Sequence, residues 1–98
     1  MTYDLIIKSP AETDIAKAVE WYADKSKKLG RRFLNVVNGS LTNIKDQPTL
    51  FQRRYREIRI VFIQYFPYGI YYTIEHKTIY EHEVLHTKRN PETVIERI

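Results

Sequence analysis

The end of the chain gathers residue types that bind or cleave a phosphodiester. A histidine, a lysine and an arginine, His86, Lys88 and Arg89, follow one another closely and precede Pro91. Proline fixes its own φ, lacks an N–H and disfavours helical backbone at the residue before it, so a strand that reaches His86 should end here. The three side chains are therefore predicted to lie at an exposed rim of the fold, where strand ends commonly bind other molecules.

RNA cleavage without a metal ion needs three kinds of group. A base takes the 2′-hydroxyl proton, cations stabilise the charge that develops on the phosphate, and an acid protonates the leaving oxygen. His86, Arg59 and Arg89, together with a tyrosine such as Tyr55 or Tyr80, include all of these types. The same side chains also pack and hydrogen-bond at sheet edges, so their presence alone does not separate an enzyme from a binding protein.

No metal site or cofactor site is expected. Cysteine is absent, which removes thiolate ligands and disulfides. His82 and His86 stand four residues apart on a predicted strand, roughly 13 Å at the rise of a strand, too far to share one ion. His76 is expected in a solvated turn. The sequence also lacks a glycine-rich phosphate loop and a Ser-His-Asp pattern.

Basic residues concentrate at two places in a chain of formal net charge +4. Such clusters attract phosphate backbones or an acidic partner segment, although a solvated basic face that keeps a small domain soluble is the alternative. The first cluster, at a predicted helix junction, comprises Lys25, Lys27, Lys28, Arg31 and Arg32. The second, opposed only by Glu57, comprises Arg53, Arg54, Arg56 and Arg59.

Length and composition predict one domain over residues 1–98. The chain has 98 residues, 43% of them hydrophobic, and a chain of this size buries somewhat over ~60% of its unfolded surface, enough for one core. No apolar run approaches the ~20 residues of a membrane span. The absence of cysteine and of a signal-like N-terminus favours a cytoplasmic protein.

The first half of the chain predicts a strand over residues 3–8 and a helix hairpin over roughly 10–46. Ser9, Pro10 and Glu12 fit the cap, the first helical position and the capping box of a helix start. Leu29-Gly30 is a plausible end of the first helix. The second helix should run to Gln47-Pro48, with an apolar stripe at three-to-four spacing formed by Phe33, Val37, Leu41 and Ile44.

The second half predicts antiparallel strands over 58–64, 70–75 and 78–86. The first is apolar on both faces, as expected of a central strand. Neither face of 78–86 is cleanly apolar, which indicates a bulge or an edge position. The predicted fold is therefore α+β: an N-terminal strand, a helix hairpin packed on a mainly antiparallel sheet of about four strands, and a short C-terminal helix. The predicted core comprises Val19, Tyr22, Phe33, Val37, Leu41, Ile60 and Phe62.

The order and spacing of several short motifs resemble the RelE/ParE superfamily of small bacterial toxins. The motifs are Trp21-Tyr22 late in the first helix, Leu29-Gly30-x-x-Phe33, Ile44-x-x-x-Pro48, Arg59, Phe66-Pro67-Tyr68-x-Ile70-x-Tyr72, and Val84-Leu85-His86-x-x-Arg89-x-Pro91. The resemblance covers nearly the whole chain. It implies the toxin of a type II toxin-antitoxin, plasmid stabilisation-like system, which halts growth unless a cognate antitoxin wraps it.

The ending His86-x-x-Arg89-x-Pro91, followed by a predicted helix over 92–98, is more similar to the ParE branch. That branch implies a poison of DNA gyrase that is not itself an enzyme and that contacts its target through His86, Lys88, Arg89 and Arg97. The chain departs from the ParE-like pattern at Val94, where a tryptophan is common.

Two other readings of the resemblance stay open. The RelE branch would imply a ribosome-dependent mRNA endoribonuclease with Arg59, His86 and Arg89 as catalytic residues. A third reading is an inactive module that retains only its antitoxin-binding surface. In each case an acidic antitoxin segment is expected to bind Arg53, Arg54 and Arg56.

Overall fold

The computed structural model describes residues 2–89, 96 and 98. Within them it confirms an α+β fold of two helices and a sheet of five strands, one more than the sequence predicts. The elements in chain order are β1 (Asp4–Ile7), α1 (Ser9–Lys25), α2 (Lys27–Asp46), β2 (Arg53–Tyr55), β3 (Ile58–Phe62), β4 (Tyr68–Glu75) and β5 (Thr78–His86). Most of the helix predicted over 92–98, with Val94 and Arg97, lies outside the described residues.

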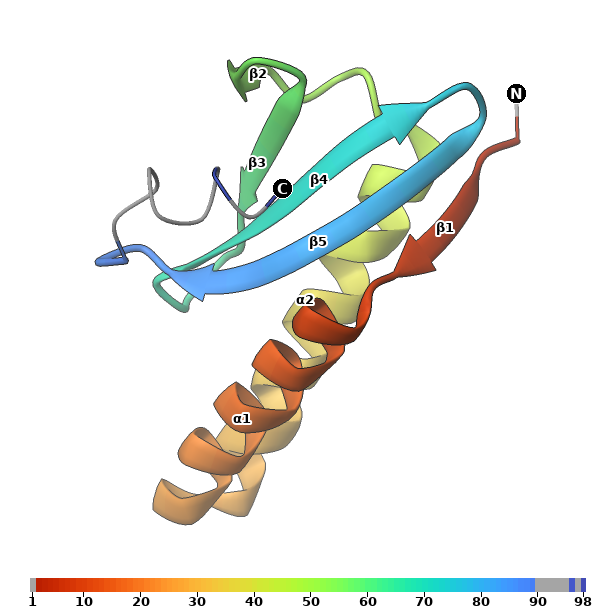
Figure 1. Cartoon of the computed structure of the whole chain (residues 1–98). Coiled ribbons are helices and arrows are strands. Elements are labelled where there is room, and N and C mark those ends of the chain that lie inside the picture. The colour runs from red at the N-terminus through yellow and green to blue at the C-terminus, as the bar shows by residue number, and fades with distance from the viewer. Residues whose placement is uncertain (1, 90–95, 97) are drawn as a thin grey trace.

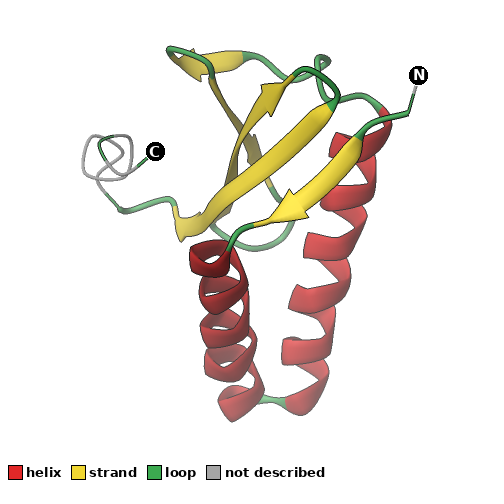
Figure 2. Cartoon of the chain, turned by 45° about the vertical axis from the view of Figure 1, so that its right-hand side comes forward, coloured by secondary structure: helices red, strands yellow, loops and turns green. Residues whose placement is uncertain are grey.

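The sheet has the strand order β1-β5-β4-β3-β2 (Figure 1). β1 runs parallel to β5, and the other neighbouring pairs are antiparallel. The additional strand, β2, is short and joins β3 through a tight turn at Arg56, whose φ is 52°. Figure 2 shows α1 and α2 side by side against the sheet, with their connection at the end far from it.

The helix hairpin differs from its prediction at both of its boundaries. Ser9 is inside α1 rather than its cap, because Lys8 remains extended and its N–H donates to the Glu81 carbonyl at 3.0 Å. The hairpin turns at Ser26, which has extended backbone, and not at Leu29-Gly30. Gly30 instead permits close helix packing, since a Cβ there would lie 2.8 Å from the Cβ of Ala23.

The main core lies between the helices and the sheet. Phe33, Val37 and Leu41 of α2 are buried as predicted, and Val19 and Tyr22 of α1 pack against them. Burial raises the pKa of Tyr72 to about 12, with Arg59 opposing the shift, and the Tyr72 hydroxyl donates to the Pro48 carbonyl at 2.7 Å. This bond fixes the segment that leaves α2.

The predicted places of Ile60 and Phe62 in this core are wrong. β3 alternates its side chains, and Val61 and Ile63 face the helices while Ile60 packs in a separate cluster with Ile58, Tyr71 and Leu85. Phe62 is 53% exposed. Because β3 is apolar on both faces, its sequence does not reveal which residues face the helices.

The irregularity expected in residues 78–86 is a β-bulge at His82. Tyr72 pairs with Glu81 and Tyr71 with Glu83, so His82 is an extra residue on β5. Ile79 and Glu81 face the helices before the bulge, and Val84 and His86 face them after it. The prediction of a bulge is confirmed, and the bulge explains why neither face of this strand reads as apolar.

Glu81 is fully buried, and neither of its carboxyl oxygens has a hydrogen-bond partner in the described part of the chain. Burial, with a smaller contribution from Asp14, raises its pKa from 4.5 to about 7. A carboxyl group in such a position is favoured in its protonated form.

This shift predicts the pH dependence of stability. The folded chain binds more protons than the unfolded chain between pH 4.5 and about 7, so the free energy of unfolding falls as pH rises through that window. Glu81→Gln should remove this fall, which is on the order of 3 kcal/mol. Urea unfolding at pH 4.5 and pH 8 measures it, with Glu20→Gln, at an exposed position, as the control. If the fall in the free energy of unfolding between pH 4.5 and pH 8 is the same in Glu81→Gln as in the wild type, the raised pKa does not belong to Glu81.

A substitution of Phe62 in β3, compared with one of the buried Phe33 in α2, tests the orientation of β3. Phe33→Ala should destabilise the fold by about 3 to 5 kcal/mol, because Phe33 is fully buried. Phe62→Ala should cost less than about 1 kcal/mol, as expected of a half-exposed side chain. Thermal unfolding of the two variants gives the comparison, and equal losses of stability would reject the orientation.

Candidate functional site

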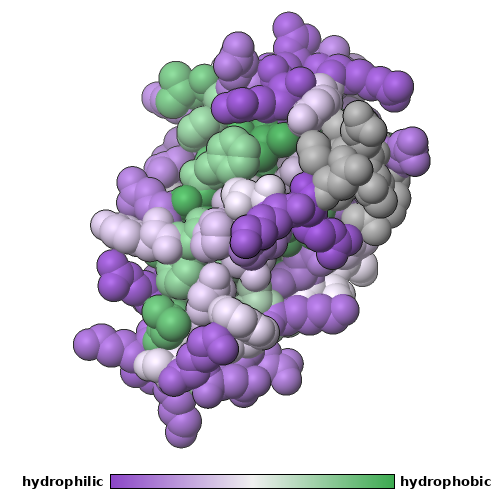
Figure 3. All heavy atoms as spheres, turned by 90° about the vertical axis from the view of Figure 1, so that its left-hand side faces the viewer, coloured by the Kyte–Doolittle hydropathy of each residue, from purple (hydrophilic) through white to green (hydrophobic). Residues whose placement is uncertain are grey.

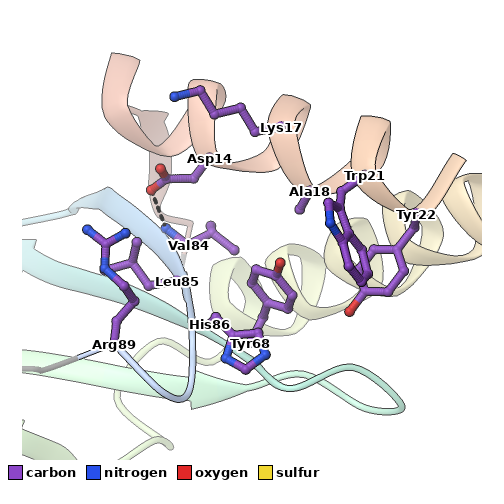
Figure 4. Close-up of a pocket in the computed structure, with 10 residues that line it drawn as sticks. All are labelled: Asp14, Lys17, Ala18, Trp21, Tyr22, Tyr68, Val84, Leu85, His86 and Arg89. Atoms are coloured by element: carbon purple, nitrogen blue, oxygen red, sulfur yellow. Dashed lines mark hydrogen bonds between the residues drawn. The ribbon is translucent and has the colours of Figure 1, made fainter. Parts of the chain in front are cut away.

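A pocket of about 430 Å³ lies between α1 and the end of β5. Figure 4 shows Trp21 and Tyr22 at one end of it and Arg89 at the other, with His86 and Tyr68 on the sheet side. The lining residues are Asp14, Lys17, Ala18, Trp21, Tyr22, Tyr68, Val84, Leu85, His86 and Arg89. The structure thus brings together two predicted site residues, His86 and Arg89.

Aromatic rings build one wall of this pocket. Tyr22 packs against Phe33 at 5.3 Å and against Phe66 at 4.8 Å between centroids, which joins the wall to the core. Trp21 meets Tyr22 edge to face at 4.9 Å and is 54% exposed. The Lys25 ammonium lies 4.1 Å from the centroid of the Trp21 ring. An apolar surface with a cation above it is therefore presented to solvent.

Hydrogen bonds fix the strand end that forms the opposite wall. The Val84 N–H donates to Asp14 Oδ2 at 3.0 Å, which ties β5 to α1. The Thr87 N–H donates to the Pro67 carbonyl at 2.8 Å, and the Arg89 N–H donates to the His86 carbonyl at 2.9 Å. Thr87, Lys88 and Arg89 are exposed. The predicted exposed rim is confirmed for these residues.

The His86 ring is held in place on both sides. It packs against Tyr68 with centroids 5.3 Å apart. Its Nδ1 accepts a hydrogen bond from the Lys88 N–H at 3.1 Å. A ring nitrogen that accepts carries no proton, so in this arrangement the ring proton is on Nε2. Burial raises the pKa of Tyr68, with smaller contributions from Tyr22 and Asp14, so its hydroxyl stays protonated.

Arg59 lies away from this pocket. It is on the helix side of β3, and its guanidinium donates to the carbonyls of Phe51 and, at 3.5 Å, Thr49. Arg59 aligns with Tyr72 of β4 and His86 with Tyr68, which separates them by roughly 13 Å along the strand. The structure therefore does not bring Arg59 to His86 and Arg89.

The other face of the sheet carries a smaller hollow of about 120 Å³. Arg54, Tyr55, Tyr71 and Arg89 line it among apolar side chains, so Arg89 borders both hollows. Burial, then Tyr55 and Glu83, raises the pKa of Tyr71, which makes its hydroxyl a poor proton acceptor near neutral pH. Tyr80 lies elsewhere on β5, with the Lys8 ammonium 5.9 Å from its ring centroid.

The predicted antitoxin-binding arginines meet on the β2–β3 hairpin. Arg53 pairs with Glu57 at 3.3 Å, and both side chains are more than half exposed. Arg54 stacks over Phe62 at 5.4 Å, and Arg56 occupies the turn. These arginines form an exposed basic edge, distinct from the pocket on α1.

Sequence analysis missed the pocket residues Asp14 and Lys17. Their spacing from Trp21 places all three on one side of α1, which is a detectable signal. Its meaning depends on knowing that the end of β5 packs on that side. Among the described residues, no group of three histidine, aspartate or glutamate side chains is placed to hold a metal ion. No helix in the same part of the chain is long and apolar enough to cross a membrane.

Comparison with known proteins identifies the fold and the family. A solved structure titled "Chromosomal ParDE TA system from P. aeruginosa" superposes with a TM-score of 0.78 at 10% sequence identity, covering 87% of this chain and 96% of that one. At this identity the match shows the fold alone. No curated protein matches the chain. The family model of the ParE toxin of the type II toxin-antitoxin system parDE matches residues 5–91. The chain therefore belongs to the ParE toxin family of type II toxin-antitoxin systems.

Proposed function

We propose that this ParE-family toxin acts in the cytoplasm by binding DNA gyrase through the pocket on α1, and that the cognate antitoxin blocks this contact. The observation that carries the proposal is the pairing of the exposed Trp21 ring with His86 and Arg89 in one pocket. Tryptophan, tyrosine and arginine are the residue types that contribute most binding energy at protein interfaces. Lys88, which is exposed beside Arg89, extends the proposed contact.

Binding accounts for this pocket better than catalysis does. A metal-independent nuclease needs a base and charge-stabilising cations around one phosphate. Arg59 donates to main-chain carbonyls of the segment that follows α2, so His86 lacks one of its two predicted catalytic partners and has only Arg89 beside it. A gyrase poison needs no acid or base of its own, and it requires only a complementary surface.

One observation supports endoribonuclease activity as a second candidate. Arg54 and Arg89 line the hollow on the other face of the sheet together with Tyr55 and Tyr71. Two cations and two phenols could bind and orient a phosphodiester there. The raised pKa of Tyr71 argues against this residue as the base, so the candidate depends on Tyr55 or on a group from the ribosome.

Substitution in the α1 pocket tests gyrase binding. Trp21→Ala and Arg89→Ala should each weaken inhibition of purified gyrase supercoiling by at least about tenfold, because each removes an exposed anchor. Lys45→Ala, an exposed change on α2 outside the pocket, should inhibit like the wild type. Cuts in ribosome-bound mRNA after induction, with supercoiling unaffected by the wild-type toxin, would instead favour the endoribonuclease.

The β2–β3 hairpin should speed association with the antitoxin. Changing Arg53, Arg54 and Arg56 together to glutamine should lower the association rate constant roughly tenfold at low salt and reduce its salt dependence, since charge mainly steers encounter. The matched control changes three basic residues at the helix hairpin tip, Lys27, Lys28 and Arg31. Surface plasmon resonance at two salt concentrations gives the rates. Equal effects of the two triple changes would show that only net charge matters.

A further inference from the structure

The tip of the helix hairpin, where α1 ends and α2 begins, is strongly basic. Hydrophilic side chains cover the lower end of the molecule in Figure 3, which is the end at which the hairpin turns in Figure 1. The basic side chains of the tip, all of them exposed, are Lys25, Lys27, Lys28, Arg31 and Arg32. The sequence contains no acidic residue from position 25 to position 45. α2 therefore offers no carboxylate near the tip to neutralise this charge.

Two of these cations lie where they weaken the helix that carries them. Lys27 and Lys28 occupy the first turn of α2, which has no acidic residue and no side-chain hydrogen bond at its cap, Ser26. The N-terminal end of a helix carries partial positive charge, so cations there are unfavourable. The stability of α2 does not account for their placement, whereas the binding of a polyanion does.

Two exposed aromatic rings lie beside these cations, one on α1 and one beside α2. The Lys25 ammonium lies 4.1 Å from the centroid of the Trp21 ring, and the Arg32 guanidinium lies 4.6 Å from the centroid of the Tyr65 ring. Trp21 is 54% exposed, and Tyr65, in the loop between β3 and β4, is 74% exposed. Each ring therefore offers accessible aromatic surface with a cation next to it.

The backbone of Tyr65 places its ring at the surface in an unfavourable conformation. Its φ of 68° lies in the left-handed region, which a bulky residue rarely adopts. The next residue, Phe66, turns into the core and meets the Phe33 ring at 5.0 Å between centroids. Residues in such backbone conformations cluster at binding sites, so the exposed ring of Tyr65 is a candidate ligand contact.

The two exposed rings flank one aromatic cluster. The Tyr22 ring meets the Trp21 ring at 4.9 Å and the ring of Phe66, the neighbour of Tyr65, at 4.8 Å between centroids. The cations beside the two exposed rings are themselves members of the basic tip. Trp21, Tyr65 and the five basic residues of the tip are together called the hairpin-tip surface below.

We propose that the hairpin-tip surface binds single-stranded nucleic acid, with bases stacked on the Trp21 and Tyr65 rings and phosphates beside the basic side chains. Proteins that bind single strands without sequence preference combine these two features. In a duplex the faces of the bases are covered by stacking, and an acidic polypeptide requires cations but not exposed rings. The pairing of exposed rings with cations therefore selects a single strand.

This proposal goes beyond the proposed gyrase contact. Neither Tyr65 nor the basic residues from 27 to 32 line the pocket on α1, which shares only Trp21 with the hairpin-tip surface. Loss of binding through Tyr65 and loss of gyrase inhibition are therefore separable.

Fluorescence anisotropy of labelled oligo(dT) and oligo(rU) strands of about 12 nucleotides tests the stacking contact with the full-length toxin. Tyr65→Asn should weaken binding roughly tenfold, because it removes the ring while asparagine tolerates the left-handed backbone. Phe62→Ala is the control and should bind like the wild type, since Phe62 is a half-exposed ring beside an arginine, Arg54, on a different hairpin. Wild-type affinity of Tyr65→Asn would overturn the proposal.

A triple substitution tests the phosphate contacts. Changing Lys27, Lys28 and Arg31 together to glutamine should lower affinity for the single strands at least about tenfold at low salt. The slope of log affinity against log salt concentration should become less steep by about 2, since each phosphate contact with a single strand contributes about 0.7. The control removes three charges elsewhere, at Arg53, Arg54 and Arg56. Equal losses in the two triple variants would show that only net charge matters and would overturn the assignment to the hairpin tip.

The choice of ligand has its own test. Trp21 is the single tryptophan of the chain, so its fluorescence reports on the proposed stacking: oligo(dT) should quench it and poly-L-glutamate should not. A preference for oligo(dT) or for oligo(rU) would identify DNA or RNA as the ligand, and either supports the proposal. Tighter binding of the corresponding duplex, or of poly-L-glutamate, would overturn it in favour of a duplex or an acidic protein.

Discussion

The packing of β5 against the two helices depends on one extra residue in this strand, His82. Before His82 the odd-numbered side chains face the helices, and after it the even-numbered ones do. The bulge thus lets Ile79 and Val84 enter the same core, although they are five positions apart. Without it, His86 would face the opposite side of the sheet. The bulge also leaves the Val84 N–H free for Asp14, which holds α1 against the strand end. The pocket between Trp21 and Arg89 exists because these two effects coincide.

The arginines of this chain show that one residue type serves different purposes according to its place. Arg59 points into the fold and holds the segment after α2 by donating to its carbonyls. Arg54 and Arg32 lie over aromatic rings at the surface, where stacking restricts their side chains. Arg89 is exposed at the strand end beside two hollows. An arginine that satisfies main-chain carbonyls is committed to stability, whereas one that remains exposed beside a hollow is available to a ligand.

Much of the fold follows from the sequence because its signals are periodic. The apolar residues from Phe33 to Ile44 recur at three-to-four spacing, which predicts a helix that packs on one face. This face is buried as predicted. Pro91 correctly signals an approaching strand end. The orientation of Ile60 and Phe62 could not be predicted. When both faces of a strand are apolar, the sequence does not show which alternate residues point toward the helices. The role of Arg59 depends on its contact with the Phe51 carbonyl in the loop before β2. The start of α1 after Lys8 depends on the contact of the Lys8 N–H with Glu81, which is distant in sequence. The sequence therefore indicated that His86 and Arg89 lie together at a strand end, but it did not indicate that α1 lies beside them.

The close approach of α1 and α2 has a consequence for how the pocket is built. Gly30 lies so near Ala23 that even one methyl group would force the helices apart. Ala23 follows Trp21 and Tyr22 by a single turn at most, so the separation of the helices also sets where the aromatic wall stands relative to β5. Because Gly30 has no side chain, α1 and α2 can pack at this short separation. The width of the pocket on α1 therefore depends on packing at the opposite side of this helix, at a position that does not line the pocket.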